Sequence, residues 1–393
     1  EIYTLSLHDA LPICCTYHGI SWIDSLFLST SAVCVTGMSP IDVSQTFTPA
    51  GLLVLMALFQ VGGLGVMTFT GFFTLFFMGN TSIYNSMMVR DMVSGNSLNS
   101  LLSTLLYILS FTVVIEAAGA FMIWTDIHGT LGYELMDEIN FSVFHAVSAF
   151  CNAGFSTLPD GLANPLVLGN HAPFYLYLSV LIILGGIGFP ILVNFKDALA
   201  LQLHRIWTLV RHHRWAGRKR YYAYNLNTRI VLIMTVFLLV IPTLCFAILE
   251  WDRALLGLTV GDKLTQAFFL AVCPRSAGFV AIDSAAWTTS TLIIFAVLMW
   301  IGGASQSTAG GIKVNTFAVM LLNLSSILRG ADRVEVFHRE LSASSIRRAN
   351  TTVLLSLSAL VLAVFIMNLL EPAIPLRSVF FECLDRKSTR LNS

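Results

Sequence analysis

Long apolar stretches dominate this sequence, and Glu116 is the one charged residue within them. Each stretch reaches the roughly 20 apolar residues that an α-helix needs to cross a bilayer. Only 11% of all residues are charged and 56% are hydrophobic, whereas an ordinary soluble protein has about 25% charged residues. This excludes a soluble enzyme, a disordered chain and a nucleic-acid binder, and it predicts an all-α polytopic membrane protein. The stretches cover residues 50–78, 101–124, 172–195, 230–249, 288–311 and 351–370.

Four shorter apolar segments alternate with these spans. At about 10–14 residues each is too short to cross the bilayer, which is typical of re-entrant or interfacial helices. Along the chain, one short segment is followed by two long ones, and this order repeats. The sequence therefore predicts a repeated structural unit. The short segments lie at residues 22–35, 139–151 and 264–273 and from Val379 onward.

Basic residues are distributed unevenly among the linkers. Linkers 80–100, 196–229 and 313–350 hold 15 of the 22 Lys and Arg residues, whereas linker 125–138 is acidic. The positive-inside rule places the basic linkers in the cytoplasm. The short segments then enter the membrane from the outer face.

The first three short segments each run into a similar string that contains a glycine. SAVCVTGMS, from Ser31, and SAFCNAGFS, from Ser148, match in register, and CPRSAGF, from Cys273, aligns on its glycine. A glycine adopts backbone dihedrals that a Cβ forbids, so carbonyl oxygens can turn towards an axis. Rings of carbonyls replace the hydration shell of a cation in selective pores. The strings favour such a filter, and the alternative is a set of unrelated re-entrant caps.

A second glycine motif follows within the next long segment. It reads VGGLG from Val61, LGGIG from Leu184 and IGGAS from Ile301. Two motifs that recur together at three places indicate a true internal repeat, which is a common feature of transporters.

The third of these long segments is rich in glycine and polar residues. Each glycine costs a helix about 1 kcal/mol relative to alanine, so we expect the stretch to be non-helical within the membrane. It is interpreted as a flexible gate across the inner pore, with a static kinked helix as the alternative. Its residues are Gly302, Gly303, Ala304, Ser305, Gln306, Ser307, Thr308, Ala309, Gly310 and Gly311.

Ionisable residues at membrane depth are costly, which makes each of them a functional hypothesis. Arg275 lies within the third string, where we expect it to support the filter by binding an acid or carbonyl groups. Glu116 is either its partner or the support of another pore helix. His145 is interpreted as a packing histidine rather than a metal ligand. Lys313 is expected to extend to the cytoplasmic interface, with a contact to the gate as the alternative.

The seven cysteines are dispersed and form no CxxC pair. This argues against a zinc site and a disulfide framework, and we expect small buried side chains. No P-loop or Rossmann fingerprint occurs, so no nucleotide site and no cofactor is expected in this chain.

These strings, together with IGGASQSTAGGIKVNTF, resemble the Trk/Ktr/HKT superfamily of potassium transporters, and within it the bacterial TrkH/KtrB membrane subunits. The resemblance implies four helix–pore-loop–helix repeats around a central pore in a multi-pass protein of the bacterial cytoplasmic membrane. It also implies a homodimer, surrounded by membrane lipid, on cytoplasmic nucleotide-binding regulatory subunits of the TrkA/KtrA type. Potassium would bind backbone carbonyls of the filter. The filter residues implied are Val35, Thr36, Gly37, Asn152, Ala153, Gly154, Ser276, Ala277 and Gly278.

The two ends of the chain depart from that pattern. No outer helix precedes the first short segment, and no filter string follows the fourth, so we expect a fragment of a longer protein whose first and last repeats are incomplete. The expected organisation is a non-native tail at 1–13, repeat 1 at 14–79, repeat 2 at 98–205, repeat 3 with the gate at 228–329, the start of repeat 4 at 350–384 and a non-native tail at 385–393.

Three functions compete on this sequence. Gated potassium uptake is favoured by Gly37, because serine at the first filter position is associated with sodium preference in part of the superfamily. A sodium-preferring or mixed potassium/sodium transporter is the alternative. An intramembrane enzyme requires a nucleophile and a base, or two carboxylates, at one depth, and the spans offer neither.

Overall fold

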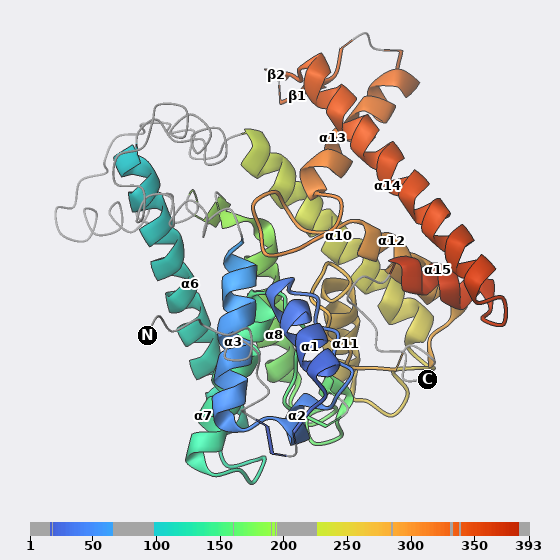
Figure 1. The fold of residues 1–393 in the computed structure, drawn as a ribbon. Helices are drawn as coiled ribbons and strands as arrows, with labels where there is room; N and C mark the ends of the chain where they lie inside the picture. The colour runs from blue at the N-terminus through green and yellow to red at the C-terminus, as the bar shows by residue number, and fades with distance from the viewer. Residues whose placement is uncertain are drawn as a thin grey trace.

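The computed structural model describes residues 16–17, 19–65, 98–159, 161–189, 191–192, 194, 226–283, 286–330, 333–337 and 339–384. The expected tails 1–13 and 385–393, and most of linkers 80–100 and 196–229, lie outside the described residues. Within them, the chain is a bundle of helices with one short β-hairpin (Figure 1). The all-α prediction is confirmed.

Three kinds of helix recur along the chain. The short segments are α1 (Trp22–Val33), α7 (Leu135–Phe150), α11 (Val260–Val272) and α15 (Leu376–Leu384). Long outer helices precede the last three of them: α6 (Leu98–Ile127), α10 (Leu226–Glu250) and α14 (Ala343–Leu370). These three are the helices in the described ranges that are long and apolar enough to cross a membrane. Inner helices follow the first three short ones: α3 (Pro49–Leu64), α8 (Ala172–Ile187) and α12 (Thr289–Trp300).

The remaining elements are small or lie at one end of the bundle. Helix α2 (Val43–Thr46) and the 3-10 turn η2 (Gly161–Ala163) connect a short helix to an inner helix. A group of elements projects from the end of the bundle opposite α7 (Figure 1). It consists of helix α13 (Val314–Leu328), strands β1 (Glu335–Val336) and β2 (Arg339–Glu340), and the start of α14.

The inner helices end earlier than the sequence predicted. The second glycine motif was expected inside the spans 50–78, 172–195 and 288–311, but α3 ends at Leu64 and α8 at Ile187. The next residues, Gly65 and Gly188, have φ angles of 85° and 99°, and a positive φ ends a helix. The motif therefore terminates each helix. Residues that follow Gly188 return to helical geometry at 189, whereas 66–97 lie outside the described residues.

Close packing explains the other glycines of the motif. A Cβ on Gly62 would overlap the carbonyl oxygen of Val33, and a Cβ on Gly185 would overlap that of Phe150. Both carbonyls belong to the last residue of a short helix. The glycines thus let each inner helix contact the carboxyl end of the short helix in its own repeat.

The largest core cluster joins repeat 2 to repeat 3. It contains side chains from α6, α7, α8 and α11. Tyr175 of α8 and Phe269 of α11 are both fully buried, with ring centroids 5.2 Å apart. This packing holds α8, the inner helix of repeat 2, against α11, the short helix of repeat 3.

Acidic residues at the outer ends of α6 and α10 hold the beginnings of the inner helices. The Asp126 carboxylate lies 3.2 Å from Nδ1 of His171, the residue before α8. Glu250 accepts hydrogen bonds from the backbone N–H of Thr288, at 2.9 Å, and from its hydroxyl, at 2.8 Å, just before α12. A carboxylate at a helix N-terminus is stabilised by the helix dipole, so each contact fixes an inner helix to its outer helix.

Glu138, in the first turn of the short helix α7, binds residues that directly follow α6. Its side chain is buried, and its Oε1 accepts from the backbone N–H of Gly129 at 2.9 Å while Oε2 lies 2.7 Å from Nδ1 of His128. The Gly129 N–H, and after it His128, lower the pKa of the Glu138 carboxyl from its ordinary value of 4.5.

We expect Glu138→Gln to lower the thermal stability of the protein at neutral pH. A carboxyl whose pKa is lowered by folding stabilises the protein above its ordinary pKa, and this stabilisation is lost as the pH falls through the lower, folded value. The gap in melting temperature between wild type and variant should therefore be widest at pH 7 and close below about pH 4.5. Asp137→Asn, at an exposed neighbour, should leave the melting temperature unchanged. A gap that is independent of pH would contradict the ionic role.

Candidate functional site

The three glycine-containing strings adopt the same backbone conformation at their glycines. Gly37, Gly154 and Gly278 have φ angles of 75°, 74° and 79°. This left-handed region suits a residue without a Cβ. The glycines that align in the sequence therefore also share a backbone conformation.

Two positions before each glycine, the strings again share an unusual conformation. Val35, Asn152 and Ser276 have φ angles of 53°, 56° and 79°. Positive φ is uncommon for residues other than glycine and is a marked outlier for a β-branched residue such as valine. Such residues cost about 1–3 kcal/mol each and persist only where the surroundings hold them. All three strings therefore contain a strained turn.

The strings lie next to one another in chain order. A Cβ on Gly37 would overlap the Ala153 oxygen, and it would lie 3.4 Å from the Cα of Gly154. A Cβ on Gly154 would lie 2.8 Å from the Ala277 oxygen and 2.9 Å from the Cα of Gly278. The residues proposed from sequence for repeats 1, 2 and 3 are thus brought together, glycine against glycine, around one site.

A cavity of about 470 Å³ lies beside the first and third strings. Its lining includes Thr36 and Ser276 from those strings, Thr308 and Gly310 from the glycine-rich stretch, and Leu384 at the end of α15. The strings and the glycine-rich stretch therefore border the same space.

The glycine-rich stretch is not helical, as its four glycines predicted. Residues 301–313 form a loop between α12 and α13, which we call the glycine-rich loop. Its two ends run together: the N–H of Gly302 bonds the oxygen of Ile312 at 2.9 Å, and the N–H of Val314 bonds the oxygen of Gly303 at 3.0 Å. The loop thus folds back on itself, with its two ends side by side.

Side chains of two strings bond this loop. The amide Nδ2 of Asn152 donates to the Thr308 hydroxyl at 2.6 Å, and the Gly310 N–H donates to the Ser276 hydroxyl at 2.9 Å. Lys313 donates from Nζ to the Ala309 oxygen at 2.7 Å. The Lys313 side chain therefore bonds another residue of the loop, in line with the alternative prediction, a contact to the gate.

Glu116 is linked to Gln60, not to Arg275. Nε2 of Gln60 donates to both carboxylate oxygens of Glu116 at 3.0 Å, and the Cys151 thiol donates to Oε1 of Gln60 at 3.1 Å. The group joins α3 and α6 to the second string at Cys151. The proposed pairing of Glu116 with Arg275 is wrong, and the alternative, a contact that holds another pore helix, describes the geometry. Gln60 was missed in the sequence, although it is the one polar side chain of the segment Pro49–Leu64.

We expect Gln60→Leu to destabilise the protein by about 1–3 kcal/mol, the usual cost of a buried polar group that loses its partner. The change leaves the Glu116 carboxylate without its amide donor. Denaturation of the purified protein in detergent measures the effect. Gln45→Leu, at an exposed residue of α2, is the matched control. Equal stability of the two variants would show that the buried contact contributes nothing.

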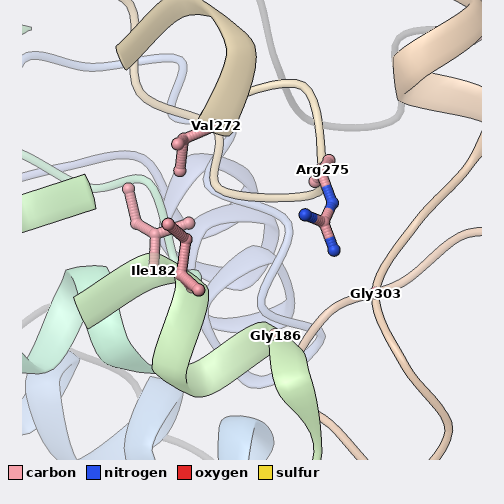
Figure 2. A pocket seen from close by; sticks show the side chains of 6 residues that line it. Ile182, Gly186, Val272, Arg275 and Gly303 are labelled. Carbon is pink, nitrogen blue, oxygen red and sulfur yellow. The ribbon is translucent and has the colours of Figure 1, made fainter. Parts of the chain in front are cut away.

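Arg275 extends from the end of α11 towards the glycine-rich loop. Figure 2 shows its guanidinium group directed towards the segment that contains Gly303, across a small cavity that Gly186 also lines. The residue is 7% exposed, and its Nε has no hydrogen-bond partner among the described residues. The geometry thus places Arg275, in the third string, beside the loop, and no acid pairs with it among the described residues, although an acid or carbonyl groups were expected.

The other singled-out side chains are satisfied or exposed. His145 is fully buried, and its ring nitrogens lie 2.8 Å from the Phe141 oxygen and 3.0 Å from the Ser156 hydroxyl, as a packing histidine does. No metal-binding group of His, Cys, Asp and Glu occurs in the described ranges. The expectation of buried cysteines is wrong for Cys34, which is exposed and lines the cavity.

Comparison with known proteins identifies the family. The model of the TrkH family, described as "Cation transport protein", matches residues 4–384. The chain belongs to this family. It is therefore a multi-pass membrane transporter of cations and not an enzyme.

Individual relatives agree with the TrkH family assignment. The chain is 32% identical over 353 residues to the potassium/sodium uptake protein NtpJ of Enterococcus hirae, covering 89% of this chain and 72% of the relative. It is 32% identical over 381 residues to the Ktr system potassium uptake protein B of Bacillus subtilis, covering 96% and 80%. The crystal structure of the potassium transporter TrkH from Vibrio parahaemolyticus has a TM-score of 0.66 at 18% identity, covers 94% of this chain and 70% of that one, and shows the common fold.

Proposed function

We propose that this transporter carries potassium into a bacterial cell across the cytoplasmic membrane, through a filter formed by the three strings and closed by the glycine-rich loop. The observation that supports it most is the approach of Gly37 to Gly154 and of Gly154 to Gly278, all three with similar positive φ angles. The resulting turns leave backbone carbonyls, which bind dehydrated cations, beside the cavity that the loop borders. The names of the relatives support potassium as the cargo.

A flux measurement tests this proposal. The transporter is reconstituted in lipid vesicles, and uptake of potassium and of sodium is followed separately under equal gradients. We expect potassium to enter faster than sodium. Faster sodium uptake would favour the alternative, a sodium-preferring or potassium/sodium transporter, for which the name of the Enterococcus hirae relative is a specific support. Vesicles that take up neither cation would contradict the proposal.

The partners are part of the same proposal. A homodimer on a cytoplasmic ring of nucleotide-binding regulatory subunits, with the nucleotide bound by the ring, fits the basic linkers 196–229 and 313–350. The triplet 218–220 in the first linker lies outside the described residues. The second linker contains α13, the β-hairpin and the start of α14, which project from one end of the bundle (Figure 1).

We expect that Arg347→Gln with Arg348→Gln weakens binding of the regulatory ring. Both arginines are exposed in the first turns of α14, and an exposed charge pair accounts for about a twofold to fivefold change in affinity per residue. A pull-down with the purified ring measures it. Arg377→Gln, an exposed basic residue at the start of α15 on the outer side, is the control. Equal capture of both variants would exclude this docking surface.

A further inference from the structure

We propose that Asn152 and Thr308 are positioning residues through which the glycine-rich loop holds the filter in shape, so that displacement of the loop changes cation selectivity as well as flux. The inference rests on the proposed function and deepens it. Filter and gate then act as one mechanical unit rather than as two barriers in series.

Thr308 is the centre of the contact. Its hydroxyl accepts from Asn152 at 2.6 Å and lies 3.1 Å from the Phe150 oxygen, to which it donates. Its backbone N–H bonds the oxygen of Gly185 at 3.2 Å. One loop residue thus binds the second string, the end of α7 and the glycine motif of α8.

The bond to Thr308 orients the side chain of Asn152. Asn152 is fully buried, and its φ of 56° lies in the left-handed region. Such a conformation persists where neighbouring groups hold it. The bond to Thr308 fixes the orientation of the Asn152 side chain. Without that bond, the backbone of Asn152 can relax towards negative φ, which rotates the adjoining carbonyl groups of the filter.

The third string repeats the arrangement with a different side chain. Ser276 has a φ of 79°, and its hydroxyl accepts from the Gly310 N–H at 2.9 Å. Val35, at the same position of the first string, has an apolar side chain that cannot form such a bond. The loop therefore supports two of the three left-handed turns, those of the second and third strings.

Thr308→Val tests the coupling, because it removes the hydroxyl and retains the shape of the side chain. We expect the ratio of potassium to sodium uptake in vesicles to fall roughly twofold to tenfold, the range that one hydrogen bond spans in an equilibrium. Thr308→Ser should restore the ratio. Asn152→Ala should lower it similarly, and the double variant should add little, because both changes break the same bond.

Thr243→Val is the matched control, because it makes the same change outside the strings and the loop. The Thr243 hydroxyl donates to the Leu239 oxygen at 2.7 Å, within the outer helix α10. This variant should keep the wild-type ratio. Where Thr308→Val does not fold, Ser276→Ala provides the second route and should lower the ratio in the same direction.

The outcomes separate the two proposals. Suppose that the wild-type protein takes up potassium, and that Thr308→Val or Ser276→Ala changes the flux but not the ratio of potassium to sodium uptake. This result overturns the coupling and leaves the proposed function intact. An equal fall of the ratio in Thr243→Val also overturns it. A wild-type protein that carries neither cation contradicts the proposed function itself.

Discussion

Gly154→Ser is expected to reduce the preference for potassium over sodium by at least about tenfold, which corresponds to about 1.4 kcal/mol. A side chain at this position meets the Ala277 oxygen at 2.8 Å and the Cα of Gly278 at 2.9 Å. It therefore displaces the neighbouring string and with it the carbonyls that replace water around the ion. Separate uptake of the two cations by vesicles gives the ratio.

Gly161→Ser distinguishes crowding in the filter from general backbone strain. Gly161 also has a positive φ, 64°, but no heavy atom lies within 4 Å of the position of its Cβ. The control shares the strain and lacks the contact with another string, so its selectivity should be that of wild type. An unchanged ratio in folded Gly154→Ser, or an equal loss in both variants, would count against the filter assignment.

Deletion of residues 303–310 is expected to raise potassium flux by roughly tenfold or more and to make it insensitive to the regulatory subunits. In the proposed gate, a few hydrogen bonds of about 0.5–1.5 kcal/mol each hold the loop in the position that closes the pore. Removal of the loop therefore opens the path for the ion. The structure favours this deletion, since a Cβ on Gly311 would lie only 2.6 Å from the Cα of Gly302. The chain can therefore be rejoined without moving α12 or α13.

Ser305→Ala serves as the control for this deletion. Ser305 is an exposed residue of the loop, so its change leaves the blocking segment in place and flux should stay low and regulated. A deletion variant that folds but keeps the same low, regulated flux would show that the loop is only a packing kink.

The repeated order of short and long apolar segments was readable from the sequence because membrane thickness limits helix length. All four short segments form helices close to their predicted bounds. The shared register of the strings likewise predicted a shared conformation, which the φ angles of Gly37, Gly154 and Gly278 display. Local patterns sufficed here because their causes are local.

Contacts between segments far apart in sequence were not readable in this way. The packing of α3 against the end of α1 depends on the approach of Gly62 to the Val33 carbonyl, 29 positions apart in sequence. The bond between Gln60 and Glu116 and the bond between Asn152 and Thr308 join still more distant segments. Periodicity and composition say which faces are apolar, but they do not say which polar residues meet.

The most direct test of the account is to locate the ions. In an experimental structure of the transporter prepared with rubidium in place of potassium, anomalous scattering marks each bound cation. If the strings form the filter, peaks lie between them, bounded by backbone carbonyls of residues 35–37, 152–154 and 276–278. Peaks confined to other parts of the protein, or no peak between the strings at saturating rubidium, would contradict the account.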